Sequence, residues 1–158
     1  MRAAVLTVST SKAAGEGEDE SGAALASFAE ALGAEIAATE VVPDDRARIE
    51  DRLRIWVDDG CDLILTTGGT GFSPTDVTPE ATRAVIEREA PGIGEAMRAA
   101  SREHTEHWML SRAVAGVAGS TLIVNFPGSP KSIAEAGEAI AGALPHALAL
   151  IAGRETRH

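Results

Sequence analysis

The sequence predicts a three-layer α/β/α fold, in which helices cover both faces of a mostly parallel sheet and a hairpin adds antiparallel strands. Up to about residue 88, short apolar runs alternate with segments of helical periodicity. Beyond that point, two β-like runs flank Gly119 and Ser120, a pair typical of a hairpin turn. With 158 residues, 44% of them apolar, the chain can build one domain over residues 1–158.

In the first half of the chain, each predicted strand is followed by a polar connection and an amphipathic helix. Strands are expected at residues 3–8, 35–42 and 62–66. The polar, glycine-rich residues 9–22 are expected to form a loop, with Ser21 as the N-cap of a helix that ends at Gly33. A second helix is expected over residues 45–59.

The second half begins with a strong helix start. Thr78 is expected as the N-cap, with Pro79 in the first turn and Glu80 as an acid near the helix N-terminus. That helix is expected to reach about residue 88. The remaining elements are predicted as a helix over 93–102, an irregular stretch over 104–110, strands over 111–118 and 121–126, and helices over 132–141 and 145–151.

Composition and charge exclude several classes of function. The formal net charge of −10 argues against a general role on nucleic acid, where a basic face supplies the affinity. No apolar run is long enough to span a membrane. The single cysteine, Cys61, precedes an apolar run and is expected to be a buried structural thiol. A reducing, cytoplasmic setting is therefore expected.

The strongest local signal is the glycine loop Thr67, Gly68, Gly69, Thr70 and Gly71, which follows a buried strand. Glycines permit positive φ and close approach of the backbone, so that successive N–H groups can converge on an anion. The loop lacks the spacing of a Walker loop and of a dinucleotide fingerprint. It predicts a phosphate-bearing ligand, with a tight turn that binds nothing as the alternative.

Two acidic positions are expected on the same rim of the sheet. Asp44 and Asp45 follow the second strand, and one of them can serve as a helix N-cap. Asp76 stands at the far end of the glycine loop, where it could simply interact with a helix dipole. Carboxylates beside phosphates also suit Mg²⁺, so Asp44 and Asp76 are candidate catalytic and metal-binding residues.

A further strand end and glycine turn follow at residues 125–131, where Ser129 and Lys131 would suit phosphate at a helix start. Ser111 and Arg112 add a second cation near the predicted hairpin. An ordinary turn with solvated side chains is the alternative. The candidate substrate-binding residues are Ser21, Gly22, Thr67, Gly68, Gly69, Thr70, Gly71, Ser111, Arg112, Asn125, Pro127, Gly128, Ser129 and Lys131.

Four segments together resemble one known family. They are DESG, VVPDD, TTGGTGFSPTDVTPEAT and LSRAVAGVAGSTLIVNFPGSPKSI. In combination they are similar to the MogA/MoaB molybdopterin-binding family, and the resemblance covers almost the whole chain. D-V-T-P and P-G-S-P-K favour MogA-like members, whereas D-E-S-G and S-R-A-V-A-G-V occur more in MoaB-like chains.

The resemblance implies a molybdopterin adenylyltransferase that uses MgATP to adenylylate the molybdopterin phosphate and releases pyrophosphate. It implies that Asp44 and Asp76 are the two catalytic acids. It also implies a homotrimer, with a hexamer in some members, and a molybdenum insertase downstream. Two rival functions remain: a MoaB-like protein that binds molybdopterin without adenylylation, and a nucleotide-processing enzyme of the CinA type.

Overall fold

The computed structural model describes residues 1–154, which fold around one six-stranded sheet of order β2-β1-β3-β6-β5-β4. The first four strands in this order run parallel, and β5 and β4 are added antiparallel. The predicted α/β class with an antiparallel hairpin is therefore confirmed. The strands are β1 (Arg2–Val8), β2 (Glu35–Val42), β3 (Leu63–Thr67), β4 (Arg88–Glu89), β5 (Ala115–Ala118) and β6 (Thr121–Phe126).

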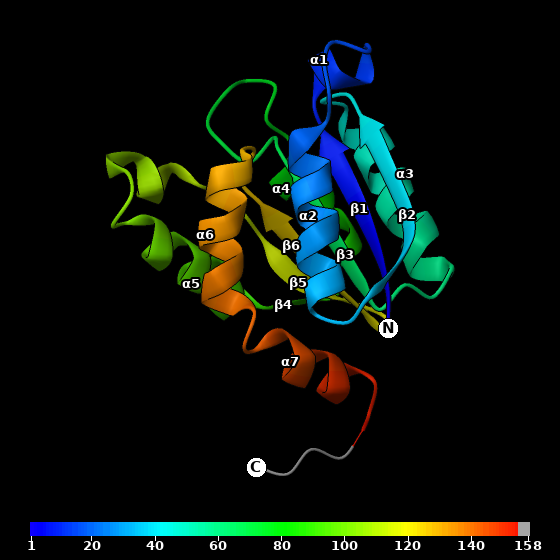
Figure 1. The fold of residues 1–158 in the computed structure, drawn as a ribbon. Coiled ribbons are helices and arrows are strands. Elements are labelled where there is room, and N and C mark those ends of the chain that lie inside the picture. The colour runs from blue at the N-terminus through cyan, green and yellow to red at the C-terminus, as the bar shows by residue number, and fades with distance from the viewer. Residues whose placement is uncertain (155–158) are drawn as a thin grey trace.

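Helices cover both faces of this sheet (Figure 1). One face packs against α2 (Glu20–Ala31), α5 (Pro91–Ser101), α6 (Pro130–Ile140) and α7 (Leu144–Ile151). The other face packs against α3 (Arg46–Asp58) and α4 (Thr78–Val85). Alternate residues of β1 serve the two cores, because successive strand side chains point to opposite faces: Val5 belongs to the first core and Leu6 to the second.

The first loop contains more structure than its composition predicts. A short helix, α1 (Thr10–Ala13), follows β1 directly and is capped by the Ser9 hydroxyl. The prediction of Ser21 as an N-cap is wrong, because α2 begins two residues earlier than predicted, at Glu20, and is capped by Asp19. The carboxylate of Asp19 accepts hydrogen bonds from Gly22 N at 2.9 Å and from the Thr7 hydroxyl at 2.7 Å. Asp19 therefore ties the start of α2 to β1.

The middle of the chain also differs from the prediction. Thr78 lies inside α4 and Val77 takes the N-cap position, while Glu80 occupies the first turn as expected. The helix ends at Val85, short of residue 88, because the chain then enters β4 and pairs with β5. A 3-10 helix, η1 (Glu106–Leu110), lies in the stretch predicted to be irregular.

All four parallel strands end at the same edge of the sheet, and the connections that follow β1, β2, β3 and β6 gather there (Figure 1). Cys61 lies near the opposite edge, just before β3, and is buried as expected. Burial raises the pKa of its thiol. Among residues 1–154, no helix has the length and apolar character needed to cross a membrane.

Candidate active site

A cavity of about 370 Å³ opens at the carboxyl edge of the sheet, beside the glycine loop. Ligands of parallel α/β sheets bind at this edge, where the strand order changes direction. Here β1 and β3 are neighbours, and the connection after β1 leads to β2 on one side while the connection after β3 leads toward β4 on the other. The cavity is lined by Thr7, Val8, Ser9, Lys12, Glu18, Asp19, Glu20, Ser21, Thr67, Gly68, Gly128 and Pro130.

The glycine loop is pressed against the end of β1. Gly68 and Gly69 have φ values of 93° and 68°. A Cβ at Gly68 would overlap the carbonyl oxygen of Val8, and a Cβ at Gly69 would overlap the Thr78 hydroxyl. Only glycine fits both the conformation and the space at these two positions.

Neighbouring hydroxyls fix the main chain of the loop. The Thr78 hydroxyl donates to Gly68 O at 2.9 Å, and Thr78 N donates to Gly69 O at 3.1 Å. The Thr67 hydroxyl donates to Pro127 O at 2.6 Å and joins the loop to the segment after β6. Thr67 and Thr70 are buried, so their side chains pack on the protein side of the loop and leave its other side open.

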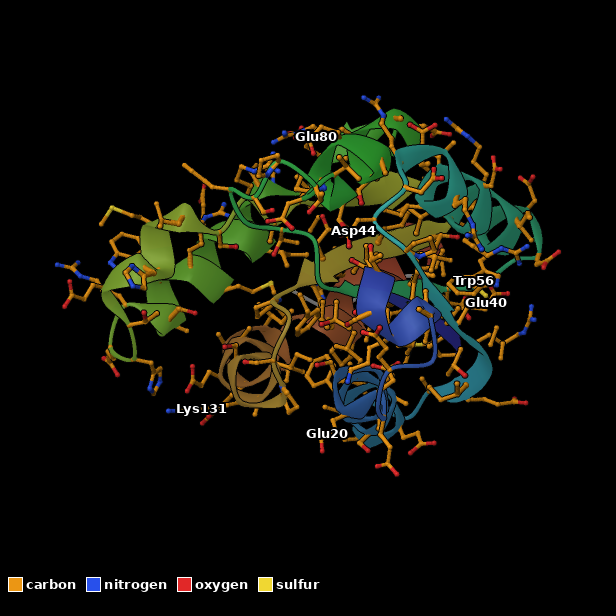
Figure 2. All side chains as sticks on the ribbon, turned by 90° about the horizontal axis from the view of Figure 1, so that it is seen from above. Glu20, Glu40, Asp44, Trp56, Glu80 and Lys131 are labelled. Carbon is orange, nitrogen blue, oxygen red and sulfur yellow. The ribbon has the colours of Figure 1, made fainter. Side chains whose placement is uncertain are left out.

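Asp44 reaches the loop from the end of β2. Its Oδ2 accepts hydrogen bonds from the Thr10 hydroxyl at 2.8 Å and from Thr10 N at 3.3 Å. Its Oδ1 would lie 3.3 Å from a Cβ placed on Gly69. Figure 2 looks down on this edge of the sheet and shows Asp44 near the middle of it. Asp45, not Asp44, caps α3 through its hydrogen bond from Arg48 N, which leaves Asp44 for another role.

Asp76 reaches the same loop from its far end. Its Oδ2 accepts a hydrogen bond from Ser73 N at 3.0 Å and would lie 2.9 Å from a Cβ placed on Gly71. Asp44 and Asp76 therefore face two loop positions, Gly69 and Gly71, that are only two residues apart. Both acids thus border the glycine loop, although 32 residues separate them in the sequence (76 − 44 = 32), and neither lines the cavity.

The donor set of this rim suits a hard divalent cation that is shared with a ligand. Within residues 1–154, no group of three or more His, Cys, Asp or Glu side chains is arranged to hold a metal by itself. Mg²⁺ typically takes one or two carboxylates and completes its shell with water and phosphate oxygens. Asp44 and Asp76 fit that pattern, provided that a phosphate supplies the remaining oxygens.

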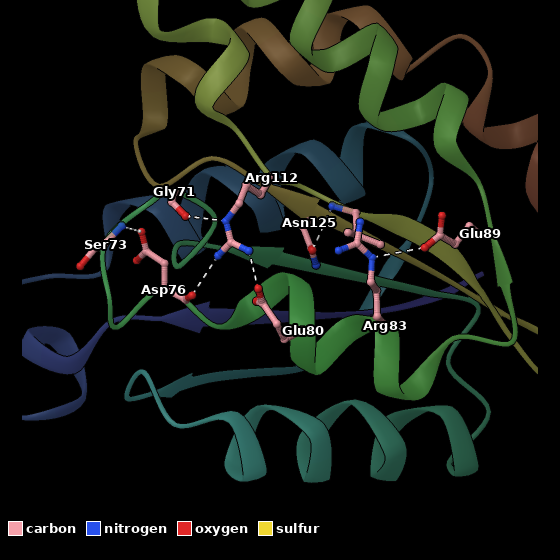
Figure 3. A network of polar contacts seen from close by, with 9 residues as sticks. Gly71, Ser73, Asp76, Glu80, Arg83, Glu89, Arg112 and Asn125 are labelled. Atoms are coloured by element: carbon pink, nitrogen blue, oxygen red, sulfur yellow. Dashed lines mark hydrogen bonds and ion pairs between the residues drawn. The ribbon is translucent and has the colours of Figure 1, made fainter.

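Arg112 and Asn125 support the rim, and neither lines the cavity. The guanidinium of Arg112 donates to Gly71 O at 2.8 Å, to Asp76 O at 2.9 Å and to the Glu80 carboxylate (Figure 3). The hydrogen bond from Arg112 holds the pKa of the Glu80 carboxyl below its ordinary value. Asn125 is fully buried, and its amide donates to the hydroxyls of Thr66 and Thr82.

The remaining candidates are dispersed, and only Ser21, Gly22 and Gly128 lie where α2 meets the segment after β6. The Ser21 hydroxyl donates to Gly128 O at 2.9 Å, and Gly22 is buried against Asp19. Ser129 caps α6, its hydroxyl accepting from Ser132 N at 3.2 Å. Ser111 lies with Pro127 in a separate hollow beside η1. Lys131 is exposed and points outward at the periphery in Figure 2.

Comparison with known proteins decides the family. Residues 4–146 match the family described as "Probable molybdopterin binding domain". The chain belongs to this family. Its structure is similar to that of MoaB from Thermus thermophilus, at 47% identity, with 99% of each chain covered and a TM-score of 0.91. A MogA structure gives a TM-score of 0.92 at 40% identity, covering 96% of this chain and 99% of that one.

Among curated proteins, the molybdopterin adenylyltransferase of Helicobacter pylori strain J99 is 46% identical over 115 residues, which is 72% of this chain. The matched region is 65% of that relative, so this molybdopterin-binding family member spans just under two thirds of the length of the bacterial protein. It spans a much smaller share of the longer eukaryotic relatives.

Sequence reasoning missed eight of the twelve residues that line the cavity of this family member, among them one lysine. Lys12, on α1, contributes the only cationic side chain to the described cavity lining. Its Nζ donates to Glu16 O, one turn further along, at 3.1 Å. The place of Lys12 in the sequence could have identified it, because Lys12 follows the first parallel strand, at the edge of the sheet where ligands bind. The glycine-rich composition of residues 9–22 concealed the helix that presents it.

Proposed function

We propose that this chain is a molybdopterin adenylyltransferase, which transfers AMP from MgATP to the phosphate of molybdopterin and releases pyrophosphate. One observation carries the proposal: Asp44 and Asp76 flank a glycine loop whose backbone is fixed against the end of β1. The relatives named above support the choice of substrates. We further propose that residues 1–154 form a single domain; residues 155–158, which the expected domain of residues 1–158 also includes, lie outside the described residues.

The reaction joins two polyanions, so its main obstacle is their mutual repulsion. An oxygen of the molybdopterin phosphate attacks the α-phosphorus of ATP, and the bond from that phosphorus to the bridging oxygen breaks. Pyrophosphate leaves with the electron pair. A phosphate monoester is largely ionised near neutral pH, and hence the nucleophile needs little help from a base. Catalysis then depends on positioning and on electrostatic stabilisation.

Each part of the rim has a role in this scheme. The backbone of Gly68–Gly71, held by Thr67 and Thr78, orients phosphate oxygens. Lys12 offsets negative charge from within the cavity. Asp44 and Asp76 would hold Mg²⁺, which supplies charge neutralisation at the reacting phosphates. Thr10, bonded to Asp44, links that acid to the helix that carries Lys12.

The test is turnover by purified wild-type chain, Asp44→Asn and Asp76→Asn, followed as pyrophosphate release that depends on both MgATP and molybdopterin. We expect each variant to lose at least about 100-fold in kcat, as is typical when a preorganised electrostatic group is removed. Neither acid is in the core, so the melting temperature should change little. Wild-type turnover in either variant would refute the role assigned to that acid.

A MoaB-like role, binding molybdopterin without adenylylation, is the second candidate, and the 47% identity to a MoaB structure favours it. It predicts molybdopterin binding with no pyrophosphate release.

The family resemblance further supports a cytoplasmic homotrimer, with a hexamer as the alternative, acting before a molybdenum insertase. Light scattering distinguishes the two assemblies.

A further inference from the structure

The side chain of Arg112 is fully engaged in closing the loop of residues 71–76. Its Nε donates to the carbonyl of Gly71, the first residue of the loop, at 2.8 Å. Its Nη2 donates to the carbonyl of Asp76, the last residue, at 2.9 Å. Arg112 N also donates to Thr70 O at 2.8 Å. One planar, rigid donor fork therefore joins both ends of the loop (Figure 3).

Within this closed loop, the carboxylate of Asp76 is turned back over the backbone. Its Oδ2 accepts from Ser73 N at 3.0 Å and lies close enough to Gly71 that a Cβ there would be 2.9 Å away. Arg112 bonds to the main-chain carbonyl of Asp76, and its described bonds include none to the carboxylate. The position of Asp76 is thus set through its backbone.

A guanidinium this close to a metal-binding acid creates an electrostatic problem. Left without a counter-ion, Arg112 would pair with Asp76, whose carbonyl it already touches, and would compete with a cation for that carboxylate. Glu80, in the first turn of α4, provides this counter-ion by accepting from Nη1 of Arg112. The charges of Arg112 and Glu80 then cancel locally, and Asp76 keeps its own negative charge.

One oxygen of the Glu80 carboxylate is buried although no hydrogen bond satisfies it. Its Oε2 is the one side-chain oxygen or nitrogen, among the described residues, that is buried without a hydrogen-bond partner. Burying an unpaired carboxylate oxygen costs stability. A glutamine would meet the geometric need for one acceptor without that charge. A carboxylate at this position is consistent with a requirement for its charge.

We propose that Arg112 and Glu80 are positioning residues for Asp76: Arg112 fixes the ends of its loop, and Glu80 neutralises Arg112 so that Asp76 remains an unpaired ligand for a divalent cation. The inference rests on the proposed function for the identity of the cation. It adds two residues that act through Asp76 and do not themselves touch the substrate.

The test measures Mn²⁺ binding by electron paramagnetic resonance, with full-length protein and a non-hydrolysable ATP analogue but without molybdopterin. Glu80→Gln should weaken Mn²⁺ binding by about 10- to 100-fold, the usual effect of losing a group that orients a metal ligand. Glu89→Gln is the matched control. Glu89, on β4, pairs at 3.2 Å with Arg83 of α4, the helix that also carries Glu80, and both side chains of that pair are 55% exposed. The Glu89→Gln variant should bind Mn²⁺ like the wild type.

Two further variants separate charge from geometry. Glu80→Gln combined with Arg112→Gln removes the unpaired guanidinium and should bind Mn²⁺ more tightly than Glu80→Gln alone. Arg112→Lys keeps the charge but cannot join both loop ends, and should weaken Mn²⁺ binding while Glu80 is intact. Melting temperatures of all variants show whether a loss of binding reflects unfolding.

The outcomes that would overturn the inference are specific. They are wild-type Mn²⁺ affinity in Glu80→Gln or Arg112→Lys, no recovery in the double variant, or wild-type affinity in Asp76→Asn. Because binding is measured without turnover, its result is independent of the proposed reaction. A chain that binds Mn²⁺ through Asp76 but adenylylates nothing would refute the proposed function and leave this inference standing.

Discussion

Replacing Gly68 by alanine should destabilise the protein far more than the same change at Gly33, although both glycines have nearly the same backbone conformation. Their φ values are 93° and 89°. A Cβ at Gly33 meets no atom within 4 Å, whereas one at Gly68 overlaps the Val8 carbonyl oxygen and lies 3.3 Å from the carbonyl carbon. The pair therefore separates backbone strain from steric overlap.

The magnitudes follow from these two terms. Positive φ costs an alanine about 1–2 kcal/mol, and this term applies to both variants. Overpacking against the main chain of β1 adds about 1–3 kcal/mol at Gly68 alone. For a chain of this size, each kcal/mol lowers the melting temperature by about 2–4 °C. We expect a fall of about 4 °C for Gly33→Ala and about 10 °C for Gly68→Ala.

Thermal unfolding followed by circular dichroism measures the difference, and calorimetric titration with MgATP shows whether the loop keeps its shape. Gly33→Ala should bind nucleotide like the wild type, because Gly33 ends α2 at the edge opposite the glycine loop. Equal melting temperatures for the two variants would refute the claim that the loop is pressed against Val8.

Three other predictions concern the supporting residues. Lys12→Ala should raise the KM for one of the anionic substrates about tenfold, equivalent to about 1.4 kcal/mol. Lys131→Ala, the control, should change that KM less than about threefold. Steady-state kinetics, with each substrate varied in turn, measures the KM of both variants. Asn125→Ala should lower the free energy of unfolding by about 3–5 kcal/mol in urea titrations, because Val114 N loses its acceptor and two buried hydroxyls lose a donor; a loss below about 1 kcal/mol would contradict this. The pKa of Glu80 is lowered by its hydrogen bond from Arg112, so its contribution to stability is present above the ordinary glutamate pKa of about 4.3 and is lost as pH falls through the lowered value. The melting-temperature gap between the wild type and Glu80→Gln should therefore close in acid, and a constant gap from about pH 7 to about pH 3 would exclude this linkage.

Periodicity was sufficient for β2 and β6, whereas it missed β4 and began β5 four residues too early. The second strand matches its predicted bounds of residues 35–42, because its β-branched residues end at a proline. The run 121–126 is likewise correct, since each of its residues is buried between the two helical layers. Local chemistry also placed Gly33 correctly after its helix, where it adopts a positive φ.

Local patterns do not reveal a hydrogen-bond partner that is distant in sequence. Arg112 looks like a phosphate-binding cation, but its acceptors lie 32 to 41 residues away and only the fold brings them near. Asn125 begins a segment rich in turn residues, yet it points inward to Thr66 and Thr82. Ser21 and Asp19 are both good N-caps, and the choice of Asp19 depends on its bond to Thr7 of β1.

The strand order also sets the sequence in which the site can be assembled during synthesis. β6 pairs with β3 through residues 59 positions apart, as in Leu63 and Leu122, and it separates β3 from the hairpin partner β5. A nascent chain that has emerged only as far as β5 carries the glycine loop and both acids, but β3 still has an open edge. Pro127, the acceptor for Thr67, follows that last strand. The glycine loop therefore becomes rigid only after most of the chain has left the ribosome, and until then β3 presents an unpaired edge of the kind that favours aggregation.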